Sequence, residues 1–142
     1  MKLIACISLI IAALAHADET ADRSAIERVI RLLSDRQPVP AQKQISTLFT
    51  ADADSDLARL TELNGQWLQL SREPSSEMTT PRLAIHSIRF VTPDVALVNA
   101  ASVQYGSNIP VGRIPMLFVM KKEGTDWRIA ALRVLVDLAN LP

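Results

Sequence analysis

An apolar run near the start of the chain decides how the rest of it can be stabilised. Lys2 gives a positive start, residues 3–14 are almost entirely apolar, and Ala15-His16-Ala17 has small residues at its first and third positions. A positive start, a short apolar segment and an Ala-x-Ala site are the pattern of a secretory signal peptide. We therefore expect residues 1–17 to be removed after Ala17 and the mature chain to be exported, to a periplasm or out of the cell.

Two other interpretations of this segment are weaker. A membrane-spanning helix needs roughly 20 consecutive apolar residues, and the run from Leu3 to Leu14 stops well short of that. Leu3-Ile4-Ala5-Cys6 is similar to a lipid-attachment box, but its cysteine stands at the beginning of the apolar run and not after it. We expect no contact with a membrane once the signal has been removed.

Signal removal also removes the only cysteine. Cleavage after Ala17 takes 17 of the 142 residues and leaves 125, with no cysteine and with His86 as the one histidine. Exported domains often use disulfides for stability, and this one cannot. A chain of this length forms one domain that must rely on a packed hydrophobic core. The sequence thus predicts a single domain over residues 18–142.

Composition and motifs exclude several function classes. The chain has 15 basic and 15 acidic residues, so no overall field attracts nucleic acid. Its six aromatic residues are not interleaved with basic ones, as a base-stacking surface requires. No glycine-rich phosphate loop and no nucleophile motif is present. We expect no nucleic-acid partner and no cofactor.

The first half of the mature chain reads as helical. Ile26, Val29, Ile30 and Leu33 have the spacing of one helix face, and Pro38 ends that helix. A second, shorter helix is predicted from Pro40 and carries Ile45, Leu48 and Phe49 inward. An acidic turn is predicted at Asp52, Asp54 and Asp56. Residues 57–70 fit either a short helix or, in part, a first strand.

The second half reads as strands, and a turn-prone segment over residues 71–81 separates the halves. Strands are predicted over 83–91, 95–105, 114–120 and 127–138, with a bulge between Ile85 and Ile88, where the apolar phase switches. A four-residue turn at 123–126 pairs the last two strands. It sets Met120 opposite Ile129, Phe118 opposite Ala131 and Met116 opposite Arg133.

Both faces of that last hairpin are largely apolar, whereas a sheet with one solvated face should alternate more cleanly. We therefore expect the helices to cover one face and a partner subunit, or more of the same chain, to cover the other. Helices followed by strands predict an α+β fold.

The order of elements resembles a known superfamily. The resemblance rests on residues 26–33, on Leu48-Phe49-Thr50-Ala51-Asp52-Ala53, on Asp94-Val95-Ala96-Leu97-Val98, and above all on the hairpin over residues 117–130 with its Trp127-Arg128-Ile129. Over roughly residues 20–138 the chain is similar to the nuclear transport factor two-like superfamily, and within it to the SnoaL-like domain group. The resemblance implies a cone-shaped, curved antiparallel sheet packed against the N-terminal helices, a cavity between them, and dimers formed through the sheet.

The superfamily includes ketosteroid isomerases, dehydratases, polyketide cyclases and domains without catalysis, so the fold does not choose the function. The isomerases use a tyrosine and carboxyl groups in an apolar pocket. Here the first helix has no tyrosine, and the sole tyrosine, Tyr105, lies late in a strand. Catalytic residues therefore cannot be transferred from the family. The short segment after Asp54 also puts the depth of a cavity in question.

A few polar residues are the candidate site. Histidine is the residue type best suited to acid–base catalysis at neutral pH, so His86 is a catalytic candidate, with Asp137 as the second. A structural or surface histidine is the alternative for His86. Polar residues on otherwise apolar strands need hydrogen-bond partners if buried. Asn99, Tyr105 and Arg133 are therefore predicted to bind a ligand, and Trp67 to line the pocket mouth. The alternative for Arg133 is a place at a sheet edge or a dimer rim.

We expect no metal site. With no cysteine and one histidine, the mature chain lacks the ligands of a zinc site. The Asp52, Asp54 and Asp56 series lacks the glycine and the distal glutamate of a calcium loop.

Three hypotheses for function follow. The first is an exported, dimer-forming domain that binds a small apolar or amphipathic ligand in a cone-shaped cavity. The second is an isomerase- or cyclase-like enzyme with one acid–base residue in that cavity. The third is a structural protein-interaction domain with a large apolar interface on its sheet. The specific activity is not set by any motif.

Overall fold

A computed structural model describes residues 2–34, 42–70, 82–106 and 109–135, with side chains for 18–34, 45–63, 82–105 and 112–135. The predicted site residue Asp137 lies outside the described residues. The helices are α1 (Lys2–Ser34), α2 (Gln42–Thr47) and α3 (Leu57–Leu70). The strands are β1 (Phe49–Ser55), β2 (Arg82–Thr92), β3 (Val95–Gly106), β4 (Ile109–Glu123) and β5 (Asp126–Val134).

The five strands form one mixed sheet in the order β1-β5-β4-β3-β2. Strands β2 to β5 form an antiparallel meander, and β1 joins the edge parallel to β5. The predicted α+β class is confirmed. The prediction of an antiparallel sheet holds for β2 to β5, whereas β1 pairs with β5 in parallel at the edge of the sheet.

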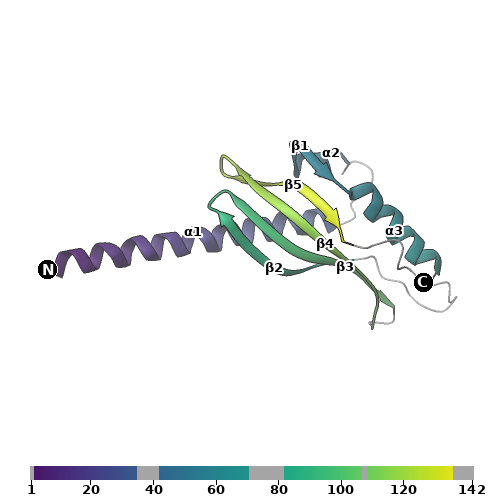
Figure 1. Ribbon diagram of the computed structural model, residues 1–142, viewed down its shortest axis with the longest axis horizontal. Coiled ribbons are helices and arrows are strands. Elements are labelled where there is room, and N and C mark those ends of the chain that lie inside the picture. Colours follow the sequence, from purple (N-terminus) through teal and green to yellow (C-terminus); the bar gives the residue numbers. More distant parts are fainter. Residues whose placement is uncertain (1, 35–41, 71–81, 107–108, 136–142) are drawn as a thin grey trace.

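Helix α1 lies across one face of this sheet, and its N-terminal part extends beyond the sheet (Figure 1). The predicted signal boundary at Ala17 falls inside this helix. Ile26 and Ile30 lie one turn apart on the buried side and are 0% and 1% exposed. Helix α1 ends at Ser34, and the proline predicted to stop it, Pro38, follows four residues later. None of the described helices is long and apolar enough to cross a membrane.

One hydrophobic core joins the helices to the sheet. Leu60 and Leu63 of α3 belong to the same cluster as Ile26 and Ile30 of α1, so both helices lie on one side, here called the inner face. The sheet supplies the rest of this cluster, mainly Val98, Met116, Phe118, Met120, Ile129 and Leu132, each at most 1% exposed. Burying such side chains contributes about 1.5–3 kcal/mol each, which stabilises a chain without disulfides.

The β4–β5 hairpin turns at Gly124 and Thr125, with Gly124 at a φ of 65°. The predicted pairing of Met120 with Ile129 is confirmed. The next two predicted pairs are wrong, because the register shifts by one residue after Met120. Phe118 pairs with Leu132 and Met116 with Val134. The extra residue, Ala130, turns Arg133 to the face opposite the core.

A second bulge lies in β2 between Ile85 and Ser87, where one was predicted. His86 is the extra residue. The bulge lets Ile85 and Ile88 both reach the inner side, although an unbroken strand would point them to opposite faces.

The predicted acidic turn at residues 52–56 is wrong. Asp52 and Asp54 lie in strand β1, and the predicted inward helix residue Phe49 opens that strand. For residues 57–70 the sequence allowed either a helix or a strand, and the structure shows a helix, α3. Ser55 Oγ accepts a hydrogen bond from the Leu57 N–H at 3.1 Å, so its hydroxyl satisfies one of the free donors at the helix start.

Candidate functional site

Three of the predicted site residues lie on the sheet face opposite α1, here called the outer face. Ser87, Asn99, Leu117 and Arg133 pair in turn across β2, β3, β4 and β5, so they form one row across that face. His86 precedes Ser87 and is exposed. The structure therefore places His86, Asn99 and Arg133 on one face, but on an exposed surface and not in an enclosed cavity.

His86 contacts a residue that the sequence analysis did not single out. An Arg113 guanidinium nitrogen lies 2.5 Å from His86 Nε2. Because a guanidinium can only donate, Nε2 accepts, and the ring proton is assigned to Nδ1. Arg113 is on β4 and His86 on β2, so the contact crosses β3. The register places Ala101 of β3 between the two, on the same face, and Ala101 is 0% exposed although it is not part of the core cluster.

Asn99 is also satisfied locally. Its side-chain amide donates to Ser87 Oγ at 3.0 Å. Tyr105 lies near the end of β3 and is half-buried, and it has an interaction partner. Trp67 lies in α3, at a position whose side chain is outside the described ones. The predicted roles of these residues in ligand binding stay predictions.

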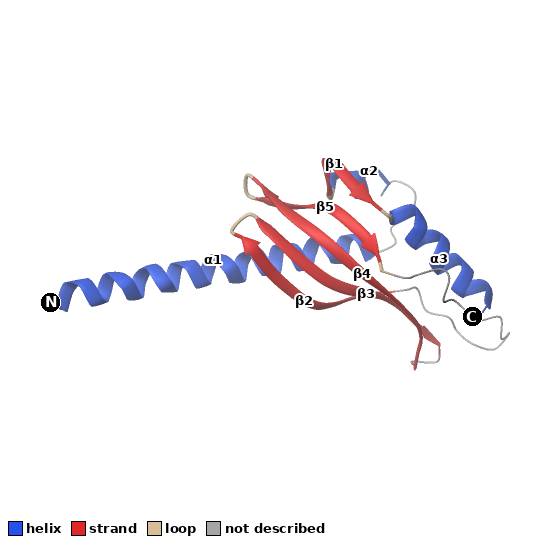
Figure 2. Ribbon diagram, viewed as in Figure 1, coloured by secondary structure: helices blue, strands red, loops and turns tan. Residues whose placement is uncertain are grey.

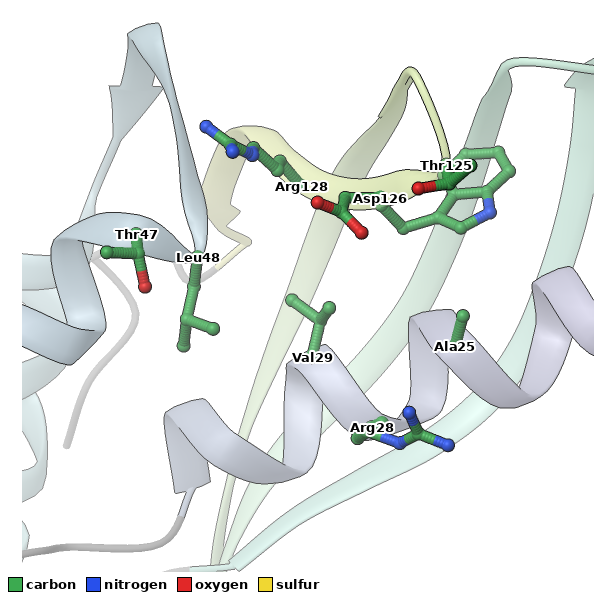
Figure 3. Close-up of a pocket in the computed structure, with 9 residues that line it drawn as sticks. Ala25, Arg28, Val29, Thr47, Leu48, Thr125, Asp126 and Arg128 are labelled. Carbon is green, nitrogen blue, oxygen red and sulfur yellow. The ribbon is translucent and has the colours of Figure 1, made fainter.

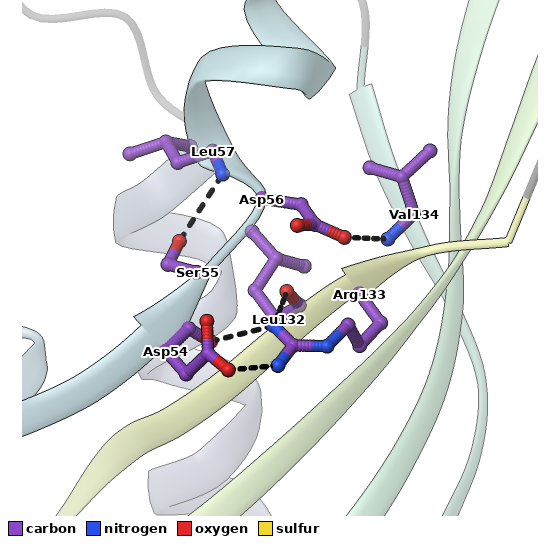
Figure 4. Close-up of polar contacts among 7 residues, drawn as sticks. All are labelled: Asp54, Ser55, Asp56, Leu57, Leu132, Arg133 and Val134. Carbon is purple, nitrogen blue, oxygen red and sulfur yellow. Dashed lines mark hydrogen bonds and ion pairs between the residues drawn. The ribbon is translucent and has the colours of Figure 1, made fainter.

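Arg133 is held by the neighbouring strand (Figure 4). Its guanidinium donates to the Asp54 carboxylate, and to the main-chain oxygens of Asp54 at 3.1 Å and Leu132 at 3.2 Å. The hydrogen bond and charge of Arg133 lower the pKa of Asp54, and the same hydrogen bond raises the pKa of Arg133. Arg133 thus joins the edge strand β1 to its neighbour β5. Its predicted role in ligand binding and the edge-or-rim alternative both stay predictions.

Asp56 strengthens the same junction. Its carboxylate accepts the Val134 N–H at 3.1 Å, and its own N–H donates to Leu132 O at 3.0 Å. Asp54 and Asp56 therefore serve the pairing of β1 with β5. Among the residues that the structure describes, no group of three or more histidine, cysteine, aspartate or glutamate side chains could hold a metal ion.

A polar node fixes α1 to the β4–β5 hairpin. The Asp22 carboxylate accepts two hydrogen bonds from Lys122 Nζ, at 2.7 and 2.9 Å, and one from the Trp127 indole N–H at 2.9 Å. Burial alone would raise the pKa of Asp22, but the hydrogen bonds from Lys122 and Trp127, together with the Lys122 charge, lower it. Sequence spacing gives no sign of this node, because its members lie about 100 residues apart.

One open pocket of about 410 Å³ lies between α1 and the start of β5 (Figure 3). It is lined by Ala25, Arg28, Val29, Thr47, Leu48, Thr125, Asp126, Trp127 and Arg128. The four predicted site residues whose side chains the structure describes, His86, Asn99, Tyr105 and Arg133, are not among these lining residues. In Figure 3, Ala25 and Val29 point from α1 toward β5, and Leu48 points into the space beside them.

Comparison of the chain with protein-family models, with curated proteins and with solved structures found no match.

Proposed function

We propose that this chain is an exported interaction domain that binds a second copy of itself through the outer face of its sheet. The observation that carries the proposal is the centre of that face. Leu97, Leu117 and Val119 lie side by side on β3 and β4 and are only half-buried. The helix residues that pack on the sheet, Ile26, Ile30, Leu60 and Leu63, all join the inner core, so no described helix covers these side chains.

The charges around this apolar centre support a symmetric partner. Arg82, Arg89 and Arg113 are exposed toward the β2 side, and no described carboxylate pairs with them. Asp52 is exposed on β1, at the opposite edge of the sheet, beside Asp54, which is already paired with Arg133. A two-fold axis parallel to the strands would lay β2 of one copy over β1 of the other. The arginines of each copy would then face Asp52 of the other, which favours this orientation over others.

The inner side of the sheet offers less for a ligand. Met116, Phe118 and Met120 are at most 1% exposed and fill the space below α1. The cone-shaped ligand cavity and a catalytic residue within it stay hypotheses. The enzyme hypothesis needs His86 or Asp137 inside a cavity, and the exposure of His86 on the outer face favours the interaction hypothesis over it.

Analytical ultracentrifugation tests the proposal, on protein purified after expression of the full sequence. Leu117→Asp places a charge at the centre of the outer face, and Leu32→Asp is the matched control, since Leu32 is 51% exposed on α1. We expect wild type and Leu32→Asp to sediment as dimers, and Leu117→Asp as a monomer with an unchanged circular-dichroism spectrum.

A monomeric wild type over the micromolar range would overturn the proposal, as would a Leu117→Asp variant that still dimerises. Dimerisation should also weaken as salt rises, because the flanking arginines and aspartates are exposed and become screened.

A further inference from the structure

Strand β2 forms one edge of the sheet. Among the strands that the structure describes, only β3 pairs with it. Every second residue of β2 therefore directs its N–H and C=O groups away from β3. Because β2 is 11 residues long, this row of backbone groups would be a ready site for the addition of another strand. The side chains along this edge thus decide whether copies of the chain can join through it.

Helix α1 occupies two of these backbone groups. Ser34 Oγ accepts a hydrogen bond from the Leu83 N–H at 3.1 Å, and Arg23 Nη1 donates to Ile88 O at 3.3 Å. Leu83 and Ile88 belong to the same edge-facing row, although they are an odd number of positions apart, because the bulge adds His86 between them. The two helix residues lie about three turns apart, so α1 spans much of the edge. Both follow the predicted signal, so the mature chain keeps them.

Further contacts hold Arg23 beside this edge. Its Nη2 donates to Glu19 Oε1 at 3.4 Å, and its guanidinium lies 5.7 Å from the centroid of the Phe90 ring. A strand added here would have to displace this guanidinium or bury it, and burying an unpaired charge is costly. The bulge at His86 also twists the edge, which makes it a poorer template for another strand.

From these contacts we infer that α1 is an autoinhibitory cover, which prevents the edge of β2 from pairing with strand β1 of a second copy. Strand β1 lies at the opposite edge of the same sheet. It carries the exposed Asp52, whereas β2 carries the exposed Arg82 and Arg89, so the charges of the two edges are complementary. Joining β2 to β1 would be a head-to-tail contact that repeats without closing. Such a contact extends the sheet and is distinct from the outer-face contact of the proposed function, which this inference does not require.

Sedimentation velocity tests the inference on protein expressed from the full sequence, in a Leu117→Asp background that removes the outer-face contact. The double variant Arg23→Ala/Ser34→Ala should form species larger than a dimer, which grow with protein concentration and bind thioflavin T. Gly124→Ala controls for stability, because it strains the β4–β5 turn and adds no contact to α1 or β2. Arg31→Ala controls for charge, since Arg31 has a similar exposed pair with Glu27. Both controls should stay monomeric. A monomeric double variant, or equal assembly of either control, would overturn the inference.

Two further results test the parts of the inference separately. Asp52→Lys should abolish assembly of the double variant, because it places a positive charge opposite the arginines of β2. Assembly that persists would overturn the choice of β1 as the added strand. In the otherwise unchanged chain, Ser34→Ala should speed hydrogen exchange of the Leu83 amide about three- to tenfold. The Ala84 amide faces β3 and should exchange as in wild type. An unchanged Leu83 rate, or equal effects on both amides, would overturn the role of α1 as a cover.

Discussion

Asp22 in α1 and Lys122 near the end of β4 are joined by two hydrogen bonds, of 2.7 and 2.9 Å, across 100 residues of sequence. Trp127 donates a third to the same carboxylate and lies 5.8 Å from Lys122 Nζ, measured to the ring centroid. Phe90 then meets Trp127 edge-on, and Arg23 lies over Phe90. Polar contacts thus fix the position of α1 along the sheet, while the apolar core holds it there.

We predict that Asp22→Asn destabilises the fold by about 2 kcal/mol, because Lys122 loses its charged partner while it stays partly buried. Urea unfolding at pH 7 measures the change. Glu27→Gln is the control: Glu27 forms an exposed pair with Arg31 at 3.6 Å, and its loss should cost well under about 1 kcal/mol. Equal effects of the two variants would contradict a special role for Asp22.

The same node predicts a pH dependence. The folded pKa of Asp22 is lowered from its ordinary value of 3.8, so its contribution is fully present above that value. It is lost as pH falls through the lowered folded pKa. The difference in unfolding free energy between wild type and Asp22→Asn should therefore be constant from pH 5 to 7 and shrink below about pH 4. A difference that stays constant down to pH 2 would contradict this assignment.

Ile26 packs α1 against the sheet through apolar contacts, beside the polar contacts of Asp22. Ile26→Ala should destabilise the fold by about 3 kcal/mol, since it leaves a cavity between α1 and the sheet. Leu32→Ala, on the exposed side of α1, should change stability by less than about 0.5 kcal/mol. Thermal unfolding of both variants checks this. Similar losses of stability in the two variants would contradict the packing of Ile26 between α1 and the sheet.

Gly124 adopts a φ of 65°, and no atom lies within 4 Å of a Cβ added there. Gly124→Ala therefore costs only the left-handed backbone conformation, about 1 kcal/mol. Gly124→Asn should cost less, because asparagine tolerates that conformation better than alanine does. Denaturant midpoints of the two variants test the order, and the reverse order would indicate a different turn.

Export predicts a defined N-terminus. Protein recovered from a secreting host should begin at Asp18, as judged by intact mass and N-terminal sequencing. Ala17→Leu should block this processing, because the cleavage site requires a small residue at that position. A purified wild-type chain that retains Met1–Ala17 would contradict the signal-peptide interpretation.

Apolar spacing in the sequence predicted the features of the fold that depend on neighbouring residues alone. The spacing of Ile26 and Ile30 gave the buried face of α1, and the phase switch between Ile85 and Ile88 located the bulge at His86. Strand β1 was missed because its centre alternates alanines with aspartates and lacks the large apolar and β-branched side chains that are typical of strands. It pairs through main-chain contacts and through Arg133, which no local pattern reports.

The candidate site was harder to predict, because it depends on register. One extra residue, Ala130, changes the partner of Arg133 from Met116 to Leu117 and moves it to the outer face. The sequence analysis did not predict a role for Arg113, because only the folded sheet brings Arg113 on β4 close to His86 on β2. Asn99 was predicted to bind a ligand because it is a polar residue on an apolar strand, and that role stays a prediction. In the structure its side-chain amide donates to Ser87 Oγ on the neighbouring strand.

The most direct test of the outer-face interface is a distance across it. A single spin label at Asn99→Cys, in a chain whose Cys6 is absent or replaced by serine, reports on the centre of the outer face. A label at Leu32→Cys reports on the far side of α1. Pulsed electron paramagnetic resonance should give a dipolar distance at position 99 that is clearly shorter than the one at position 32. No dipolar coupling at position 99, or a shorter distance at position 32, would contradict self-association through this face.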